Sequence, residues 1–213
     1  EHTILDRADL VMIDPVGTGF SRVVGKGEGK DFWGVDQDAR SVSDFIVRFL
    51  NQAGRWASPK YILGESYGGM RSGAVAYVLL DRHNVALNGV ILVSPYMDFV
   101  AGNADLQIDV AHVNFMTTYA ATAWYHNAVA NRPSDLKAFL KEAEAFARDV
   151  YAPVLFKGAR ATAEERRAAV EGLARYTGLR ADYWEKANLR IDEGRFLQEL
   201  LRDRGLVVGR VDT

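Results

Sequence analysis

The chain has 213 residues, 48% hydrophobic and 25% charged, which is typical of a globular protein and not of a disordered or fibrous one. Its formal net charge of −2 provides no basic field for binding nucleic acid or anionic lipid, so neither is expected as a partner. No apolar run approaches the ~20 residues that a membrane span needs, and the absence of cysteine excludes disulfides and thiolate metal sites.

Strand and helix signals alternate through the first half of the chain. The apolar run at 10–13 (LVMI) stops at Asp14-Pro15, which predicts a buried strand that ends at a loop, because proline cannot donate to a sheet ladder. Gly54 is suited to end the helix predicted around residues 42–50. Strands are predicted at 10–13, 61–63 and 90–93, and helices around 42–50 and after 66. This order indicates a parallel sheet with crossover helices.

From residue 101 onward the pattern is helical throughout. Thr162 and Glu165 form a capping box at the start of one helix, which Gly178 ends. Further apolar stripes predict helices at 136–150 and 196–201. Because no strand is predicted in this half, we expect a partial α/β core in residues 1–100 and a helical cap in residues 101–213.

Residues 64–68 (GESYG) match the pattern G-x-S-x-G, between a predicted strand and a predicted helix. In that setting the pattern indicates a nucleophile elbow, a sharp turn that lifts the Ser66 hydroxyl above the sheet. The turn demands strained backbone angles, which predicts a positive φ at Ser66. The helix N-terminus favours developing negative charge, and the backbone N–H of Tyr67 is the candidate oxyanion donor. The pattern taken alone is weak, and a chance match is the alternative.

Two motifs together, residues 14–21 (DPVGTGFS) and 64–69 (GESYGG), resemble the serine carboxypeptidase family in its bacterial branch. The resemblance implies an α/β-hydrolase core that hydrolyses C-terminal peptide bonds through an acyl-serine intermediate. It also implies a peptide substrate, no metal or organic cofactor, and a secreted or periplasmic location. The oligomeric state and the peptide preference remain open.

The resemblance assigns roles to five residues. Ser66 matches the nucleophile, and Tyr67 matches an oxyanion donor. Glu65 matches a glutamate that helps to hold the C-terminal carboxylate of the peptide, an arrangement of carboxylates that works best in acid. Gly17 and Gly19 match the loop that lines the pocket, where glycine permits close backbone approach.

The chain departs from the family pattern at two places that touch the pocket walls. Arg22 follows the first motif where tyrosine is common, and residues 70–73 (MRSG) replace a His-Tyr-Val-Pro run after the second motif. Both differences concern subsite preference and leave the nucleophile unchanged.

A catalytic serine needs a base, and in this fold the triad follows the chain order Ser, Asp, His. The four histidines are His2, His83, His112 and His126. None follows a late strand. The resemblance therefore implies that the family's catalytic Asp and His lie beyond Thr213, and that its glycine-rich oxyanion segment lies before Glu1. On this hypothesis the chain is one piece of a longer enzyme, and we expect it to lack peptidase activity by itself.

Two alternatives stay open. An esterase or acyltransferase of the same fold would carry the same elbow. Glu65 separates these activities, because an ester without a free carboxylate gains nothing from it. A non-catalytic binding domain that keeps the fold is the second alternative.

Overall fold

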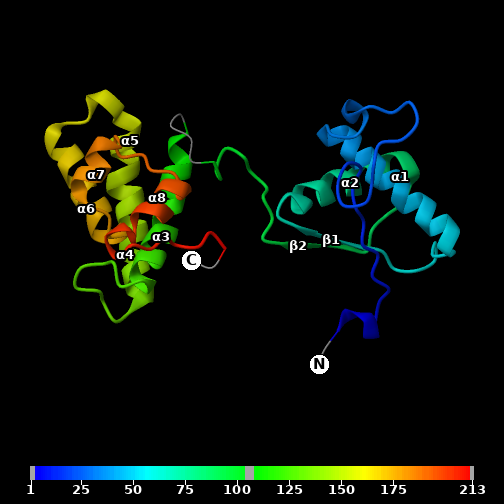
Figure 1. Cartoon of the computed structure of the whole chain (residues 1–213), viewed down its shortest axis with the longest axis horizontal. Helices are drawn as coiled ribbons and strands as arrows, with labels where there is room; N and C mark the ends of the chain where they lie inside the picture. The colour runs from blue at the N-terminus through cyan, green and yellow to red at the C-terminus, as the bar shows by residue number, and fades with distance from the viewer. Residues whose placement is uncertain (1–2, 104–107, 212–213) are drawn as a thin grey trace. The chain divides into compact units, whose positions relative to one another are not determined.

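The computed structural model describes residues 3–103 and 108–211 and divides the chain into two compact units, shown in Figure 1. Unit 1 comprises Glu1–Met97 and unit 2 comprises Asp98–Thr213. Each unit has its own hydrophobic core. None of the described helices combines the length and the apolar character needed to cross a bilayer.

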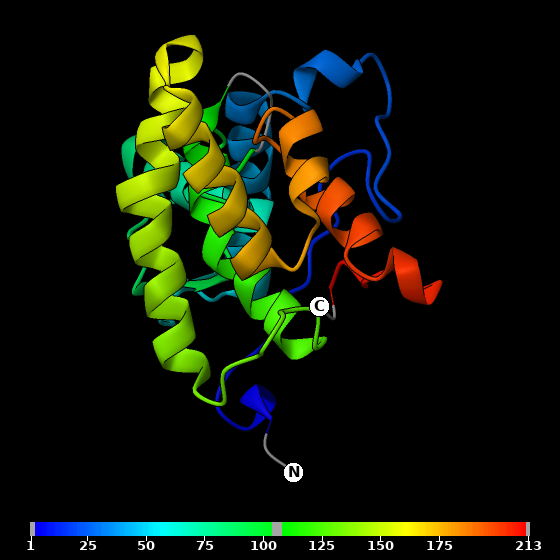
Figure 2. The same ribbon diagram turned by 90° about the vertical axis from the view of Figure 1, so that its left-hand side faces the viewer.

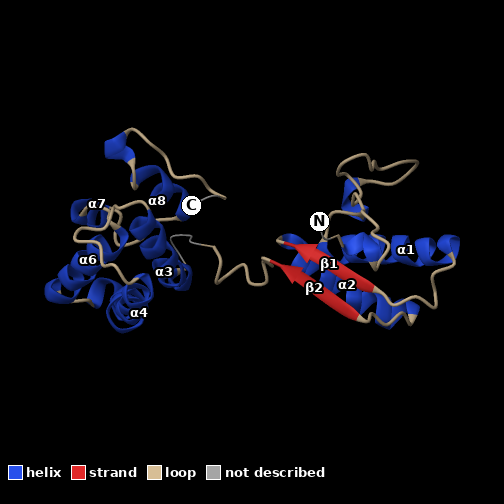
Figure 3. Ribbon diagram, turned by 90° about the horizontal axis from the view of Figure 1, so that it is seen from below, coloured by secondary structure: helices blue, strands red, loops and turns tan. Residues whose placement is uncertain are grey.

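Unit 1 contains a strand–helix–strand crossover. Strands β1 (Tyr61–Glu65) and β2 (Gly89–Val93) pair in parallel, with Tyr61 beside Gly89 and Glu65 beside Val93. Figure 3 shows the two strands lying side by side. The helices are α1 (Val35–Ala53) and α2 (Tyr67–His83), with the short 3-10 helices η1 (Ile4–Asp6) and η2 (Gly29–Asp31) before them. The helices and strands predicted between residues 42 and 93 are therefore confirmed.

Local signals set the ends of α1 and α2. Gly54 ends α1 in the left-handed region with φ 64°, where its N–H donates to the Leu50 carbonyl. Asn84 ends α2 in the same way with φ 52°. The two helices share one small core with the nearest strand residue, Ile62. Its buried members are Ala39, Val42 and Leu50 of α1, Val75, Val78 and Leu79 of α2, and Val85.

The strand predicted at residues 10–13 does not form. These residues are irregular, and their side chains are exposed, with Met12 at 82%. An apolar run specifies burial, whereas a strand also needs a neighbour that accepts and donates backbone hydrogen bonds. Among the described residues β1 and β2 pair only with each other. The structure is thus mostly helical with a two-stranded parallel sheet, which is compatible with an α/β fold. The third strand of the partial core that we expected is not formed by the described residues.

Unit 2 is helical in every described element, as the sequence pattern predicts. Figure 2 turns these helices, coloured green to red, toward the viewer. The Thr162 hydroxyl accepts from the Glu165 N–H at 3.1 Å and the Glu165 carboxylate accepts from the Thr162 N–H at 2.9 Å, which confirms the capping box. The helices are α3 (Asp109–Tyr125), α4 (Leu136–Phe146), α5 (Ala152–Lys157), α6 (Ala163–Thr177), α7 (Ala181–Lys186) and α8 (Glu193–Glu199), with the short turns η4 (Gly158–Arg160) and η5 (Arg202–Arg204).

The helix predicted at 136–150 is longer than the apolar stripe suggests and changes its winding. After α4 it passes through a π-helical turn, η3 (Ala147–Tyr151), and continues as α5. Pro153 is the second residue after this turn. Because proline has no N–H and its ring clashes with the carbonyl four residues back, a wider turn accommodates it without ending the helix.

Two buried hydrogen bonds connect residues 184–189, in and after α7, to the helical core of unit 2. The Tyr151 hydroxyl donates to the Leu189 carbonyl at 2.6 Å, both within the core. Burial raises the pKa of Tyr151, so the hydroxyl stays a donor at every pH of interest. The Trp184 indole donates to the Thr177 hydroxyl at 3.0 Å in the same core.

We expect Tyr151→Phe to lower the free energy of unfolding by about 1–3 kcal/mol, because it leaves the buried Leu189 carbonyl without its donor. Urea denaturation measures the change. Tyr125→Phe is the matched control, since that ring is 67% exposed and should change stability by less than about 0.5 kcal/mol. Equal midpoints for Tyr151→Phe and the unmodified protein would refute this contact's contribution.

Candidate active site

Ser66 lies at the sharp turn between β1 and α2. Its backbone angles are φ 56° and ψ −120°, a region that L-residues rarely adopt, so the predicted positive φ is confirmed. Three backbone hydrogen bonds hold this conformation. The Ser66 N–H donates to the Val93 carbonyl at 3.1 Å, and the Ser66 carbonyl accepts from the N–H groups of Gly69 at 2.9 Å and Tyr96 at 3.0 Å. These bonds tie the turn to the end of β2 and offset a backbone strain of roughly 1–3 kcal/mol.

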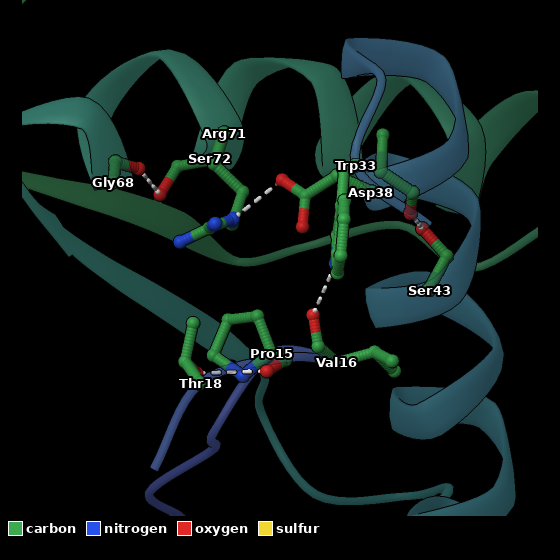
Figure 4. A network of polar contacts seen from close by, with 10 residues as sticks. Pro15, Val16, Thr18, Trp33, Asp38, Ser43, Gly68, Arg71 and Ser72 are labelled. Atoms are coloured by element: carbon green, nitrogen blue, oxygen red, sulfur yellow. Dashed lines mark hydrogen bonds and ion pairs between the residues drawn. The ribbon is translucent and has the colours of Figure 1, made fainter. Parts of the chain in front are cut away.

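Two glycines allow the close packing around the turn. A Cβ on Gly64 would collide with the backbone carbonyl of Gly68 and with the Ser72 hydroxyl. That hydroxyl donates to the Gly68 carbonyl at 2.6 Å, as Figure 4 shows. A Cβ on Gly69 would collide with Pro95. A Cβ on Gly68, the second glycine of the G-x-S-x-G pattern, would meet nothing within 4 Å, so the close approach occurs at Gly64 and Gly69.

We expect Gly64→Ala to lower the free energy of unfolding by about 1–3 kcal/mol or more, because the added methyl group meets backbone atoms that cannot rotate away. Gly73→Ala is the matched control. A Cβ there meets nothing within 4 Å, and alanine within a helix should raise stability by roughly 0.5–1 kcal/mol. Thermal and urea unfolding of both variants would measure this. A Gly64→Ala protein as stable as the parent would contradict the packing account.

Tyr67 is the first residue of α2. The first amides of a helix have no intrahelical acceptor, so its N–H is available at the positive end of the helix dipole. Its ring lies under the guanidinium of Arg71, whose Cζ is 5.0 Å from the ring centroid. The backbone donor and the adjacent ring are therefore held by the same first turns of α2.

Glu65 ends β1 and is exposed. Side chains alternate along a strand, and Gly64 faces α2, so the Glu65 side chain lies on the opposite face of the sheet. It forms no ion pair within 4.0 Å with the described residues. Glu65 is adjacent to Ser66 in the chain and has a carboxylate free for an external partner.

The loop at 14–21 is folded back upon itself. The Asp14 carboxylate accepts from the Phe20 N–H at 2.9 Å, and the Thr18 hydroxyl donates to the Pro15 carbonyl at 2.7 Å. Gly17 has φ 94° and Gly19 has φ 48°. A Cβ on Gly17 would lie 2.7 Å from the indole nitrogen of Trp33, and one on Gly19 would collide with the Asp14 carboxylate. Closure of the loop itself therefore requires both glycines, a reason that the sequence pattern did not reveal.

A chain of contacts connects this loop to the elbow. The Trp33 indole donates to the Val16 carbonyl at 3.1 Å, and Trp33 lies two residues before α1. Asp38, in the first turns of α1, accepts from Arg71 Nε of α2 at 2.6 Å. Figure 4 shows these contacts together. Asp38 and Trp33 carry no motif signal, and Arg71 was marked in the sequence only as a departure from the family pattern.

The described histidine of unit 1 cannot act as the base for Ser66. His83 is the last residue of α2, and its Nε2 lies 3.3 Å from Asp44 Oδ1 of α1. A helix of 17 residues places that end about 25 Å from the elbow. In unit 2, His112 is buried within α3 and His126 follows it, whereas His2 lies outside the described residues.

A shallow groove of about 390 Å³ in unit 1 lies along α1 and contains none of the predicted site residues. Its lining comprises Asp31, Phe32, Gln37, Arg40, Ser41, Asp44, Phe45 and Arg48. No group of three or more His, Cys, Asp or Glu side chains within residues 3–103 and 108–211 is arranged to hold a metal ion. The candidate site is formed by three consecutive residues, Glu65, Ser66 and Tyr67, at the turn between β1 and α2.

Comparison with known proteins identifies one family. The family model for serine carboxypeptidases matches residues 5–167, from the start of unit 1 into α6 of unit 2. No curated protein and no solved structure matches the chain. Since the family model covers more than half of the 213 residues, the chain belongs to the serine carboxypeptidase family.

Proposed function

We propose that this chain carries the nucleophile of a serine-type carboxypeptidase, with residues 1–100 as the part of the core that holds it and residues 101–213 as a helical cap. The observation that carries the proposal is the conformation of Ser66. A non-glycine residue held at φ 56° between a strand and a helix, in a chain of this peptidase family, supports the role of a nucleophile elbow.

The proposed reaction has two steps. The Ser66 oxygen attacks the carbonyl carbon of the last peptide bond while a base takes its proton, and the negative charge gathers on the carbonyl oxygen. The Tyr67 N–H, at the N-terminus of α2, donates to that oxygen. The C–N bond then breaks, the amine takes the proton and leaves as the C-terminal amino acid, and water hydrolyses the acyl-serine. The base is a group other than His83, which is paired at the far end of α2.

Glu65 supports a peptidase over an esterase or an acyltransferase. Its carboxylate is exposed one residue before Ser66 and has no partner among the described residues. A peptide that ends in a free carboxyl group gives this side chain something to bind when the two groups share a proton, whereas a simple ester does not.

The activity is tested with the full-length protein and three substrates. The products measured are the C-terminal amino acid from an N-blocked dipeptide, the amino acid amide from its C-terminal amide, and ethanol from a related ethyl ester. We expect kcat/KM for the free acid to exceed that for the amide by at least about tenfold, the value of one charge-assisted hydrogen bond. Hydrolysis of the ester without release from either peptide would favour the esterase. Binding of peptide without turnover of any substrate would favour the non-catalytic domain.

A further inference from the structure

Arg71 lies one helical turn beyond Tyr67 and is held from two sides. Its Nε donates to Asp38 at 2.6 Å, and its Cζ lies 5.0 Å from the centroid of the Tyr67 ring. The side chain is 28% exposed and that of Asp38 is 13% exposed, so both belong to the partly buried surface of unit 1. In Figure 4 the Nε edge faces Asp38, and the remaining guanidinium nitrogens point away from it.

The guanidinium has unused donors. It carries five N–H groups in a planar fork, and the contact through Nε occupies one of them. No described residue accepts a hydrogen bond from either Nη atom of Arg71. If Arg71 served only to join α1 and α2, its Nε contact with Asp38 would suffice. Such a role does not explain why the two Nη atoms have no acceptor among the described residues.

A carboxylate is the partner that this geometry favours. Two parallel N–H donors match the two oxygens of a carboxylate, which makes such contacts directional as well as strong. Asp38 compensates the charge of Arg71 in the absence of a ligand, so the guanidinium can stay partly buried and fixed. The Tyr67 ring covers one face of the fork and leaves its edge as the side on which hydrogen bonds can form.

The position places this edge beside the reaction centre. Tyr67 and Arg71 are four residues apart on α2 and share one face of the helix, and Tyr67 directly follows Ser66. A substrate whose carbonyl is attacked by Ser66 and polarised by the Tyr67 N–H therefore lies within about one helical turn, ~5.4 Å along the axis, of Arg71.

We propose that Arg71 is a specificity-determining residue that binds a carboxylate of the substrate through its two Nη atoms. The proposal rests on the proposed function, because it takes Ser66 as the centre on which the substrate is positioned. The carboxylate comes either from the C-terminus of the peptide or from an acidic side chain next to the scissile bond. Arg71 binds a carboxylate by donating N–H hydrogen bonds to it, whereas Glu65 binds one only when the two carboxyl groups share a proton. The two residues therefore recognise a carboxylate by different chemistry.

Calorimetric titration of the full-length protein in a Ser66→Ala background, which prevents turnover, tests this. The ligands are an N-blocked dipeptide with neutral side chains, its C-terminal amide, and an amide that carries a glutamate side chain. We expect a carboxylate-bearing ligand to bind about 10–100-fold more tightly than the neutral amide at pH 7. Preference for the first ligand identifies the chain end, and preference for the third identifies the side chain.

Three variants separate recognition from packing. Arg71→Gln should abolish the preference for the carboxylate, and Arg71→Lys should retain a fraction of it, because an ammonium supplies charge without the fork. Asp38→Asn removes the ion pair between the helices and should keep the preference. If Arg71→Gln lowers Tm but leaves the ratio of the two Kd values unchanged, Arg71 serves packing only and the proposal is wrong.

If Arg71→Gln does not fold, Arg71→Lys and Asp38→Asn test whether Arg71 binds the carboxylate. A carboxylate preference unchanged in Arg71→Lys, or lost in Asp38→Asn alone, would overturn the proposal. The proposed function fails separately. It is contradicted if the full-length protein without substitutions hydrolyses no peptide, whereas loss of the Arg71 effect leaves hydrolysis that depends on Ser66 intact.

Discussion

Replacement of Ser66 by alanine in the full-length protein should lower kcat for a peptide substrate by roughly 10⁴–10⁶, the loss typical of removing a member of a serine triad. The acyl intermediate cannot form without the hydroxyl, whereas the backbone that holds the turn should be little changed. The three hydrogen bonds at residue 66 involve only its N–H and carbonyl groups, and alanine keeps both. We therefore expect KM and Tm to change much less than kcat.

Ser41→Ala is the matched control for this experiment. Ser41 lies on α1 and lines the groove that contains none of the predicted site residues. Ser41 is half-buried and lies apart from the predicted site residues, so its replacement should leave kcat within about twofold of the parent value and change stability by only about 0.5 kcal/mol. A Ser66→Ala protein that retains more than about a hundredth of the parent rate would contradict the nucleophilic role.

Replacement of Glu65 by glutamine should raise KM for N-blocked dipeptides by about 10–100-fold and change KM for simple esters little. Glutamine keeps the shape of the side chain but removes the charge-assisted hydrogen bond to the terminal carboxyl group, a contact of about 1.5–3 kcal/mol. The shared proton is lost from the parent enzyme as pH rises, so the increase in KM for peptides with rising pH should become smaller in the variant. Steady-state kinetics with both substrates between pH 4 and 7 measure the effect.

Glu164→Gln, an exposed substitution in the first turn of α6, controls for a general effect of removing a carboxylate. It should leave the kinetics with both substrates unchanged. Equal losses on peptide and ester in Glu65→Gln would show that Glu65 supports the fold of the elbow instead of recognising the terminal carboxyl group.

The elements that sequence reasoning predicted correctly have local causes. The capping box of Thr162 and Glu165 and the left-handed caps at Gly54 and Gly178 each involve residues within one turn of the helix end. The run at 10–13 shows the limit of local reasoning. Its apolar composition is that of a strand, but strand formation depends on a partner elsewhere in the chain, and among the described residues the sheet consists of β1 and β2 alone.

The same distinction holds at the candidate site. The strain at Ser66 could be predicted because the motif and the flanking strand and helix lie within a few residues of it. The ion pair between Asp38 and Arg71 joins residues 33 positions apart, and nothing in the spacing indicates it. Gly17 is a second example. Glycine is needed there because the indole of Trp33, distant in the sequence, packs against it.

Labelling of the full-length protein with a fluorophosphonate, followed by mass spectrometry of its peptides, tests the central claim most directly. The reagent reacts with a serine hydroxyl only where a base and oxyanion donors activate it. A single adduct on Ser66, in the peptide that joins β1 to α2, is the predicted result. An adduct on a different serine, or none in a preparation that hydrolyses peptides, would show that Ser66 is not the nucleophile.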